Sequence, residues 1–164
     1  MDIFDQAMAI EQQGAEFYQA LADDAPDEGS GYIFSWLVEQ ERKHFAIFKK
    51  MKASGALPAG KSSDLKGVRE IFVGWKDARA RLNIKADQVK LYLQALEVEE
   101  KSVRLYEDAA RAADDDAVRQ VFLRIAAEEK AHRQIMENII EFVSKPEIWV
   151  ENAEFGYRGE DYYL

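Results

Sequence analysis

The segment Ile125-Ala-Ala-Glu-Glu-Lys-Ala-His-Arg-Gln-Ile-Met136 combines a helical pattern of apolar residues with a carboxylate and an imidazole. Alternate steps of four and three residues give the stripe Val118, Phe122, Ile125, Glu129, His132, Met136, Ile139 and Val143. This spacing is typical of a helix that packs one face against a core. Because residues three apart share a helical face, Glu129 and His132 should both point into that core.

A second copy of the pattern lies upstream. Its stripe is Phe34, Leu37, Glu41, His44, Phe48 and Met51. Glu41 and His44 precede Glu129 and His132 by the same offset of 88 positions, and the chain has no other histidine. A repeat at a fixed offset indicates an internal duplication.

Two further helical stripes each contain a single acid. They are Phe4, Met8, Glu11, Ala15, Tyr18, Ala22 and Tyr92, Leu96, Glu99, Val103, Tyr106, Ala110. The offset of 88 aligns Glu11 with Glu99 and Tyr18 with Tyr106. Helix-capping and helix-breaking residues then predict four helices, at about 2–24, 31–54, 84–113 and 115–144. They also predict a turn before the second helix that extends to Gly31.

We expect one all-α domain over residues 1–144, with the duplicated halves at about 2–54 and 84–144. The connection at 55–83 is long enough to cross the length of a helix bundle. It contains a short amphipathic pattern in which Phe72 and Trp75 should pack. The remaining residues, 145–164, form a C-terminal extension rich in aromatic residues that should dock either on this bundle or on a second subunit.

Composition excludes several kinds of protein. The chain has no cysteine, so disulfides and cysteine-ligated metal centres are excluded within it. Its formal charge of −9 argues against nucleic acid as a partner. No apolar run approaches the roughly 18 residues of a membrane-spanning helix, and the first residues lack the basic start of a signal peptide. We therefore expect a cytoplasmic protein without a membrane partner.

The four acids on the apolar stripes require compensation. Each ionised carboxylate in a core costs several kcal/mol unless it is neutralised, and two divalent cations would neutralise four of them. One inward Glu from each of two helices and a Glu-x-x-His pair from each of the others is the di-metal pattern of helix bundles. Oxygen and nitrogen ligands suit iron, manganese or zinc. We predict two iron ions, because zinc cannot change valence and so cannot reduce a bound oxidant.

Other polar residues near these stripes have alternative interpretations. Tyr18 and Tyr106 lie two turns beyond Glu11 and Glu99, so each hydroxyl could bond a ligand carboxylate or be an ordinary core aromatic satisfied elsewhere. The acids out of register, which we expect in solvent, are Glu39, Glu97, Glu100 and Glu128. Of these, Glu128 is the alternative to Glu129 as a ligand. The basic neighbours, also expected in solvent, are Arg42, Lys43, Lys130 and Arg133.

Three segments carry a resemblance to a known family: Ala9-Ile-Glu-Gln-Gln-Gly-Ala-Glu-Phe-Tyr18, the two Glu-x-x-His motifs, and Val98-Glu-Glu-Lys-Ser-Val-Arg-Leu-Tyr106. Across about residues 3–144 the chain resembles the ferritin-like superfamily, and within it the rubrerythrin group. The resemblance implies a four-helix bundle with one long crossover, a non-haem di-iron centre, a dimeric or larger assembly, and chemistry with peroxide or oxygen. It implies the ligands Glu11, Glu41, His44, Glu99, Glu129 and His132.

The sequence departs from that family at two points. Full rubrerythrins add a cysteine-ligated rubredoxin domain, whereas this chain has no cysteine, so a peroxidase would need an external electron donor. They also carry an additional glutamate where this chain has Ser102. In that family this glutamate is associated with a shift of the metal during peroxide reduction.

Three functions follow from these residues. The leading one is a di-iron oxidoreductase that reacts ferrous iron with hydrogen peroxide or oxygen, as a peroxidase or ferroxidase, and we expect it to be a homodimer. The alternatives are an iron-binding or storage protein without turnover, and a structural metal-bound bundle that acts as an interaction module.

Overall fold

A computed structural model describes residues 2–55, 66–78 and 85–144. The predicted aromatic extension at 145–164 and part of the predicted connection lie outside the described residues, as do the side chains of Phe72 and Trp75. The helices in the described ranges are α1 (Ile3–Asp23), α2 (Glu28–Ser54), α3 (Lys66–Ala78), α4 (Ala86–Ala112) and α5 (Asp116–Ser144).

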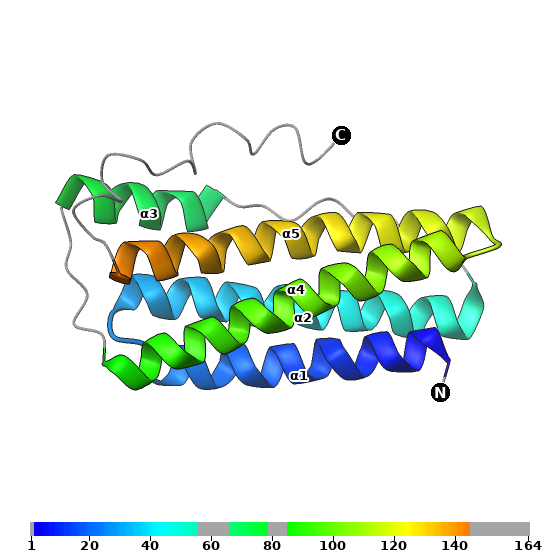
Figure 1. Ribbon diagram of the computed structural model, residues 1–164, viewed down its shortest axis with the longest axis horizontal. Helices are drawn as coiled ribbons and strands as arrows, with labels where there is room; N and C mark the ends of the chain where they lie inside the picture. The colour runs from blue at the N-terminus through cyan, green and yellow to red at the C-terminus, as the bar shows by residue number, and fades with distance from the viewer. Residues whose placement is uncertain (1, 56–65, 79–84, 145–164) are drawn as a thin grey trace.

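The four long helices form a bundle of two antiparallel hairpins (Figure 1). Helices α1 and α2 pack along each other, as do α4 and α5, and α1 also contacts α4. The short helix α3 packs near the start of α2, where Gly67 lies close to the hydroxyl of Tyr32. The predicted all-α bundle of ferritin-like architecture is confirmed.

Side-chain caps fix the helix ends. Asp2 caps α1 by accepting a hydrogen bond from the backbone N–H of Asp5 at 2.9 Å. Asp27 caps α2 by accepting from the backbone N–H of Gly29 at 2.8 Å. The prediction that the turn extends to Gly31 was wrong, because an aspartate cap satisfies the free N–H groups that the first helical turn exposes. Gly55 ends α2 with a φ of 61°, in the left-handed region that favours glycine.

Two apolar clusters fill the bundle on either side of its middle. The first contains Tyr18, Phe34, Leu37, Tyr92, Ile135, Ile139 and Phe142 among its buried members. The second contains Ala7, Phe48, Met51, Tyr106, Val121, Phe122 and Ile125. The layer between these clusters, at the level of Glu11 on α1 and Glu99 on α4, is polar and fully buried. Apolar packing therefore holds the helices together at both ends and leaves a polar layer at the centre.

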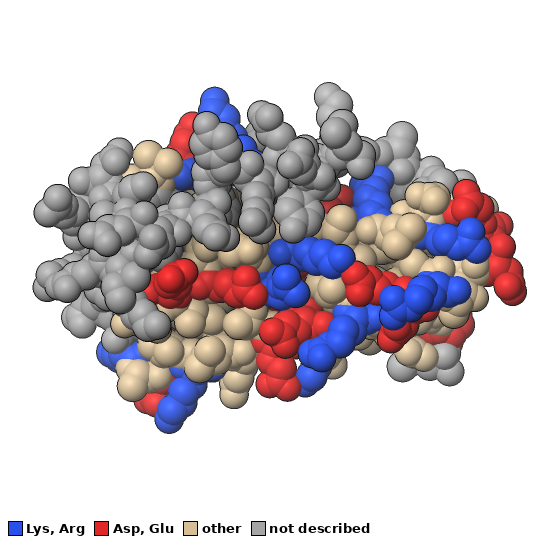
Figure 2. Space-filling view, turned by 45° about the horizontal axis from the view of Figure 1, so that its top comes forward, with Lys and Arg blue, Asp and Glu red and all other residues tan. Residues whose placement is uncertain are grey.

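The surface contrasts with this buried layer. On the face shown in Figure 2, acidic and basic side chains are interspersed. Exposed ion pairs along single helices include Lys101 with Glu97 at 2.7 Å and Arg42 with Glu39 at 2.9 Å. No helix in the described ranges has both the length and the apolar character needed to cross a lipid bilayer.

Candidate metal centre

Each long helix contributes acidic or imidazole side chains to the buried layer. Helix α1 supplies Glu11 and α4 supplies Glu99, while α2 and α5 each supply a Glu-x-x-His pair, as the sequence pattern indicates. The six residues are at most 4% exposed; they are Glu11, Glu41, His44, Glu99, Glu129 and His132. The structure thus brings together all six residues that the sequence singles out.

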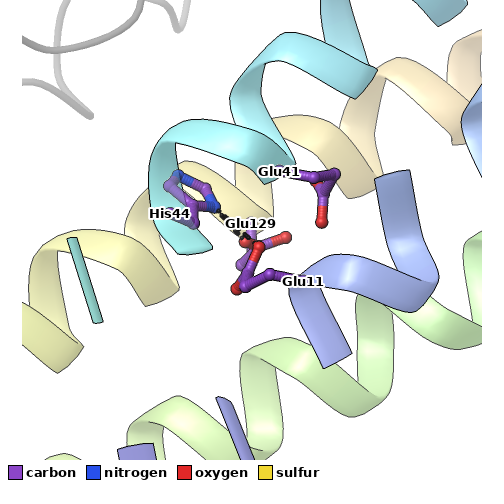
Figure 3. A group of neighbouring side chains, drawn as sticks. All are labelled: Glu11, Glu41, His44 and Glu129. Carbon is purple, nitrogen blue, oxygen red and sulfur yellow. Dashed lines mark ion pairs between the residues drawn. The ribbon is translucent and has the colours of Figure 1, made fainter. Parts of the chain in front are cut away.

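These residues form two overlapping groups, each with one ligand atom per residue and with those atoms within 4.8 Å of one another. We call the first group site 1; it consists of Glu11, Glu41, His44 and Glu129 (Figure 3). We call the second group site 2; it consists of Glu41, Glu99, Glu129 and His132. Glu41 and Glu129 belong to both sites. Each site therefore has one carboxylate and one imidazole of its own and shares two carboxylates with the other.

The imidazole Nδ1 atoms face the carboxylates. Nδ1 of His44 lies 2.7 Å from Oε1 of Glu129 and 3.3 Å from Oε2 of Glu11. Nδ1 of His132 lies 3.3 Å from Oε2 of Glu129, and it also lies 3.2 Å from Oε1 of Glu41. The two rings are stacked, with centroids 5.5 Å apart. Nδ1 is therefore the atom that each histidine offers to its site.

The chemistry of the donor atoms fits a pair of cations. Among the described residues, at least one carboxylate oxygen of each of the four glutamates is buried without a hydrogen-bond partner, and so is Nδ1 of both histidines. Buried polar atoms in proteins are nearly always hydrogen-bonded, and buried charges are paired or coordinate metals. Apart from their ion-pair contacts with the imidazoles, these atoms converge on common points without hydrogen bonds, an arrangement that two divalent cations would satisfy.

The crowding of buried carboxylates at the centre also shifts the pKa values of its residues. Burial, followed by repulsion from Glu129 and Glu41, raises the pKa of Glu11 well above its usual value, and the same effects raise the pKa of Glu99. Burial opposes the charged form of His132, but Glu129 outweighs it and raises the pKa of this imidazole to about 9. Protons thus compensate part of the charge when no cation does so.

Two tyrosines brace the carboxylates from the opposite helix. The hydroxyl of Tyr18 on α1 donates a hydrogen bond to Oε1 of Glu99 on α4. The hydroxyl of Tyr106 on α4 donates to Oε1 of Glu11 on α1. Glu11 and Glu99, the terminal carboxylates that each belong to one site only, are thereby held at Oε1. Their Oε2 atoms are left directed into the buried centre.

The acids out of register divide into two kinds. Glu39 and Glu97 are exposed, and Glu100 is partly exposed, as expected from their register. The prediction that Glu128 lies in solvent was wrong: its side chain is 8% exposed and its Oε2 lies 3.0 Å from Nε2 of His44. A helical wheel shows which residues face the centre of the bundle, but residues beside that face can be buried against the next helix.

The basic residues lie around the outside of the centre. Arg42 and Lys43 are exposed, Lys130 pairs with Glu107 at 2.6 Å, and Arg133 pairs with Glu137 at 3.5 Å. Ser102 is buried and its hydroxyl donates to the backbone carbonyl of Val98 at 3.1 Å.

A surface groove of about 540 Å³ lies between α1 and α2. Its lining residues are Glu11, Gln12, Ala15, Glu16, Gln19, Arg42 and Phe45. Glu11 thus separates the buried centre from a hollow on the surface.

The sequence profile of the rubrerythrin family matches residues 2–140 and, in a second alignment, residues 90–157. The chain belongs to the rubrerythrin family. The second alignment begins at residue 90, which is 2 + 88, so it starts at the offset that relates the two halves of the chain. Comparisons with curated proteins and with solved structures gave no match. Membership of the rubrerythrin family fits a ferritin-like protein of the di-iron type, and the buried glutamate and histidine groups could hold a metal.

Proposed function

We propose that the bundle binds one iron ion at site 1 and one at site 2, and that the pair reacts with hydrogen peroxide or oxygen as a non-haem di-iron oxidoreductase. The observation that carries this proposal is the cluster of buried carboxylate and imidazole atoms that face one another without hydrogen bonds. Two ferrous ions would supply the two electrons that convert H2O2 and two protons into two water molecules.

The residues have separate roles in this function. Glu41 and Glu129 lie between the two sites and would hold the ions close together. Tyr18 and Tyr106 fix the orientation of the terminal carboxylates. The apolar clusters on both sides exclude bulk water from the layer, which strengthens electrostatic interactions within it. The chain therefore supplies positioning and charge, while the metal pair would carry the electrons.

Turnover as a peroxidase requires two electrons from another molecule after each reaction. The 164 residues contain no cysteine, so none of them can form a cysteine-ligated redox centre. We propose an external reductant of low molecular weight or an electron-transfer protein.

The test is anaerobic loading with ferrous iron followed by stopped-flow mixing with hydrogen peroxide and, separately, with oxygen. We expect two ferrous ions per chain and rapid oxidation by at least one oxidant, with two ferrous ions oxidised for each H2O2. Glu129→Gln should abolish the rapid phase, because the carboxylate belongs to both sites. Glu97→Gln is the control, since it removes the same charge from an exposed position.

Slow oxidation by both reagents would contradict the proposal. Continued loading far beyond two ions per chain, in an assembly large enough to enclose a mineral, would instead support storage.

A further inference from the structure

The two histidines differ on the side that faces away from the metal centre. Nε2 of His44 lies 3.0 Å from Oε2 of Glu128, and Oε1 of Glu128 accepts a hydrogen bond from Nε of Arg124 at 3.3 Å. The side chains of His44 and Glu128 are both buried. A carboxylate on α5 therefore supports the histidine of site 1 from behind.

The internal duplication shows what occupies the equivalent place behind His132. Subtracting the offset of 88 converts Glu128 to position 40 and Arg124 to position 36, and these positions hold Gln40 and Trp36. The carboxylate and the guanidinium of one half are thus a neutral amide and an indole in the other.

Contacts around His132 agree with this exchange. The amide of Gln40 donates to the backbone carbonyl of Trp36 at 3.3 Å. The indole of Trp36 lies edge-on to the ring of His132, with centroids 5.7 Å apart and planes at 84°. Nε2 of His132 is buried and makes no hydrogen bond among the described residues. Within residues 2–55, 66–78 and 85–144, the outer nitrogen of this histidine therefore has no anionic acceptor.

The remaining features of the two sites are matched. Both share Glu41 and Glu129, and each has one further glutamate that is held by a tyrosine hydroxyl. The environment of the outer imidazole nitrogen is accordingly the clearest difference between them.

We propose that Glu128 is a positioning residue that makes site 1 the tighter of the two cation sites, so that the pair fills in order, site 1 before site 2. This inference rests on the metal-binding function proposed above. A carboxylate that accepts the Nε2–H of His44 selects the tautomer with its lone pair on Nδ1, and it increases the basicity of that atom. Loss of such a supporting group typically costs 10–100-fold in metal affinity.

The experiment uses Co2+ alone as the probe, with calorimetry and the visible absorption of the bound ion. The wild-type chain should show two resolved binding events. Two variants that each disable one site assign these events. Glu99→Gln removes the carboxylate that belongs to site 2 alone, and Glu11→Gln removes the carboxylate that belongs to site 1 alone.

In the Glu99→Gln background, Glu128→Gln should weaken Co2+ binding by about 10–100-fold. In the Glu11→Gln background, the same substitution should leave binding almost unchanged, because Glu128 lies against Nε2 of His44, which belongs to site 1. A merely structural effect would weaken both backgrounds alike.

The reciprocal variant is Gln40→Glu, which places a carboxylate behind His132. It should strengthen binding in the Glu11→Gln background and bring the two events of the full site closer together. This arm also tests the proposal if Glu128→Gln fails to fold, as monitored by circular dichroism of the metal-free protein.

The matched control is Glu137→Gln. Arg133 and Glu137 on α5 repeat the i, i+4 pairing of Arg124 and Glu128, but Glu137 is partly exposed, whereas Glu128 is buried against His44. It should leave both events unchanged.

The proposal is overturned if wild-type binding consists of two equal events, or if Glu128→Gln affects both backgrounds equally or neither. A wild-type chain that binds no Co2+ would contradict the metal-binding function itself, which is a different result.

Discussion

Gly14 on α1 lies directly against Glu41 on α2. A Cβ atom at position 14 would be 2.6 Å from Oε2 of Glu41 and 3.2 Å from its Cδ. No real Cβ tolerates the shorter of these distances, so any larger residue would force the carboxylate to move. The absence of a side chain at one position of α1 thus allows a shared carboxylate to occupy the centre between the two metal sites.

Gly14→Ala should therefore lower the affinity of both sites, since both include Glu41. We expect a loss of about 10-fold or more in Co2+ calorimetry, as for other changes that misplace a ligand. The fold should survive, because alanine favours a helix over glycine by roughly 0.5–1 kcal/mol.

The matched control for this substitution is Gly74→Ala on α3, where a Cβ would meet nothing within 4 Å. Unchanged affinity in Gly14→Ala would show that Glu41 adapts and that the close approach has no functional role.

The tyrosines cross between the hairpins, so each should affect a different site. Tyr18→Phe removes the donor to Glu99 and should weaken site 2, whereas Tyr106→Phe removes the donor to Glu11 and should weaken site 1. Each effect should be about 10–100-fold in affinity for Co2+, measured in the single-site backgrounds.

Tyr92→Phe is the control for this pair, because Tyr92 is a buried tyrosine on α4 that packs against Phe34. An equal effect of Tyr18→Phe on both sites would contradict the crossed arrangement.

The helical periodicity of the sequence predicts the bundle and the convergence of the six side chains for a physical reason. An acid such as Glu11 or Glu99 on an apolar stripe has no route to solvent when that face packs, so the stripe itself determines where the acid lies. The fixed offset between His44 and His132 then relates the two halves. For these residues, the position of each side chain on its own helix was sufficient to predict where it lies.

The helical periodicity does not predict which side chains of neighbouring helices contact one another. Glu128 is adjacent in sequence to Glu129, and its burial depends on how α5 lies against α2, which no single stripe specifies. The start of α2 was misplaced for a local reason, because Gly29 and Gly31 after Asp27 look like a turn although the aspartate cap allows a helix. Pairings such as Tyr18 with Glu99 also require the packed helices.

The pH dependence of the metal-free protein has a definite sign. The pKa of His132 is raised from 6.5 to about 9, and that of His44 is also raised, because the carboxylates of the centre outweigh burial. The folded state therefore binds protons more tightly than the unfolded state. This contribution to stability is complete below pH 6.5 and is lost as the pH rises through about 9.

Urea unfolding of chelator-treated protein should thus give a lower free energy of unfolding at pH 9 than at pH 6.5. Affinity for Co2+ should change in the opposite direction, since bound protons compete with the metal and are released when it binds. Stability of the metal-free protein that rises over this interval would contradict the assignment of the protons to the centre.

Metal removal should lower thermal stability. A ligand that binds only the folded state adds about 2.7 kcal/mol when its concentration is 100 times its dissociation constant. We expect the melting temperature to fall on chelation and to recover on addition of Co2+. The wild-type increase should exceed that of Glu99→Gln, which retains one site. Identical melting temperatures with and without metal would contradict binding to the folded centre.

The most direct test of the buried pair of metal sites is a crystal structure of the iron-loaded protein with anomalous diffraction data collected at the iron absorption edge. We predict two anomalous peaks in the buried layer, one against Nδ1 of His44 and one against Nδ1 of His132, with Glu41 and Glu129 between them. An absence of peaks in this layer, or iron bound only at the surface while the buried side chains remain paired with one another, would contradict it.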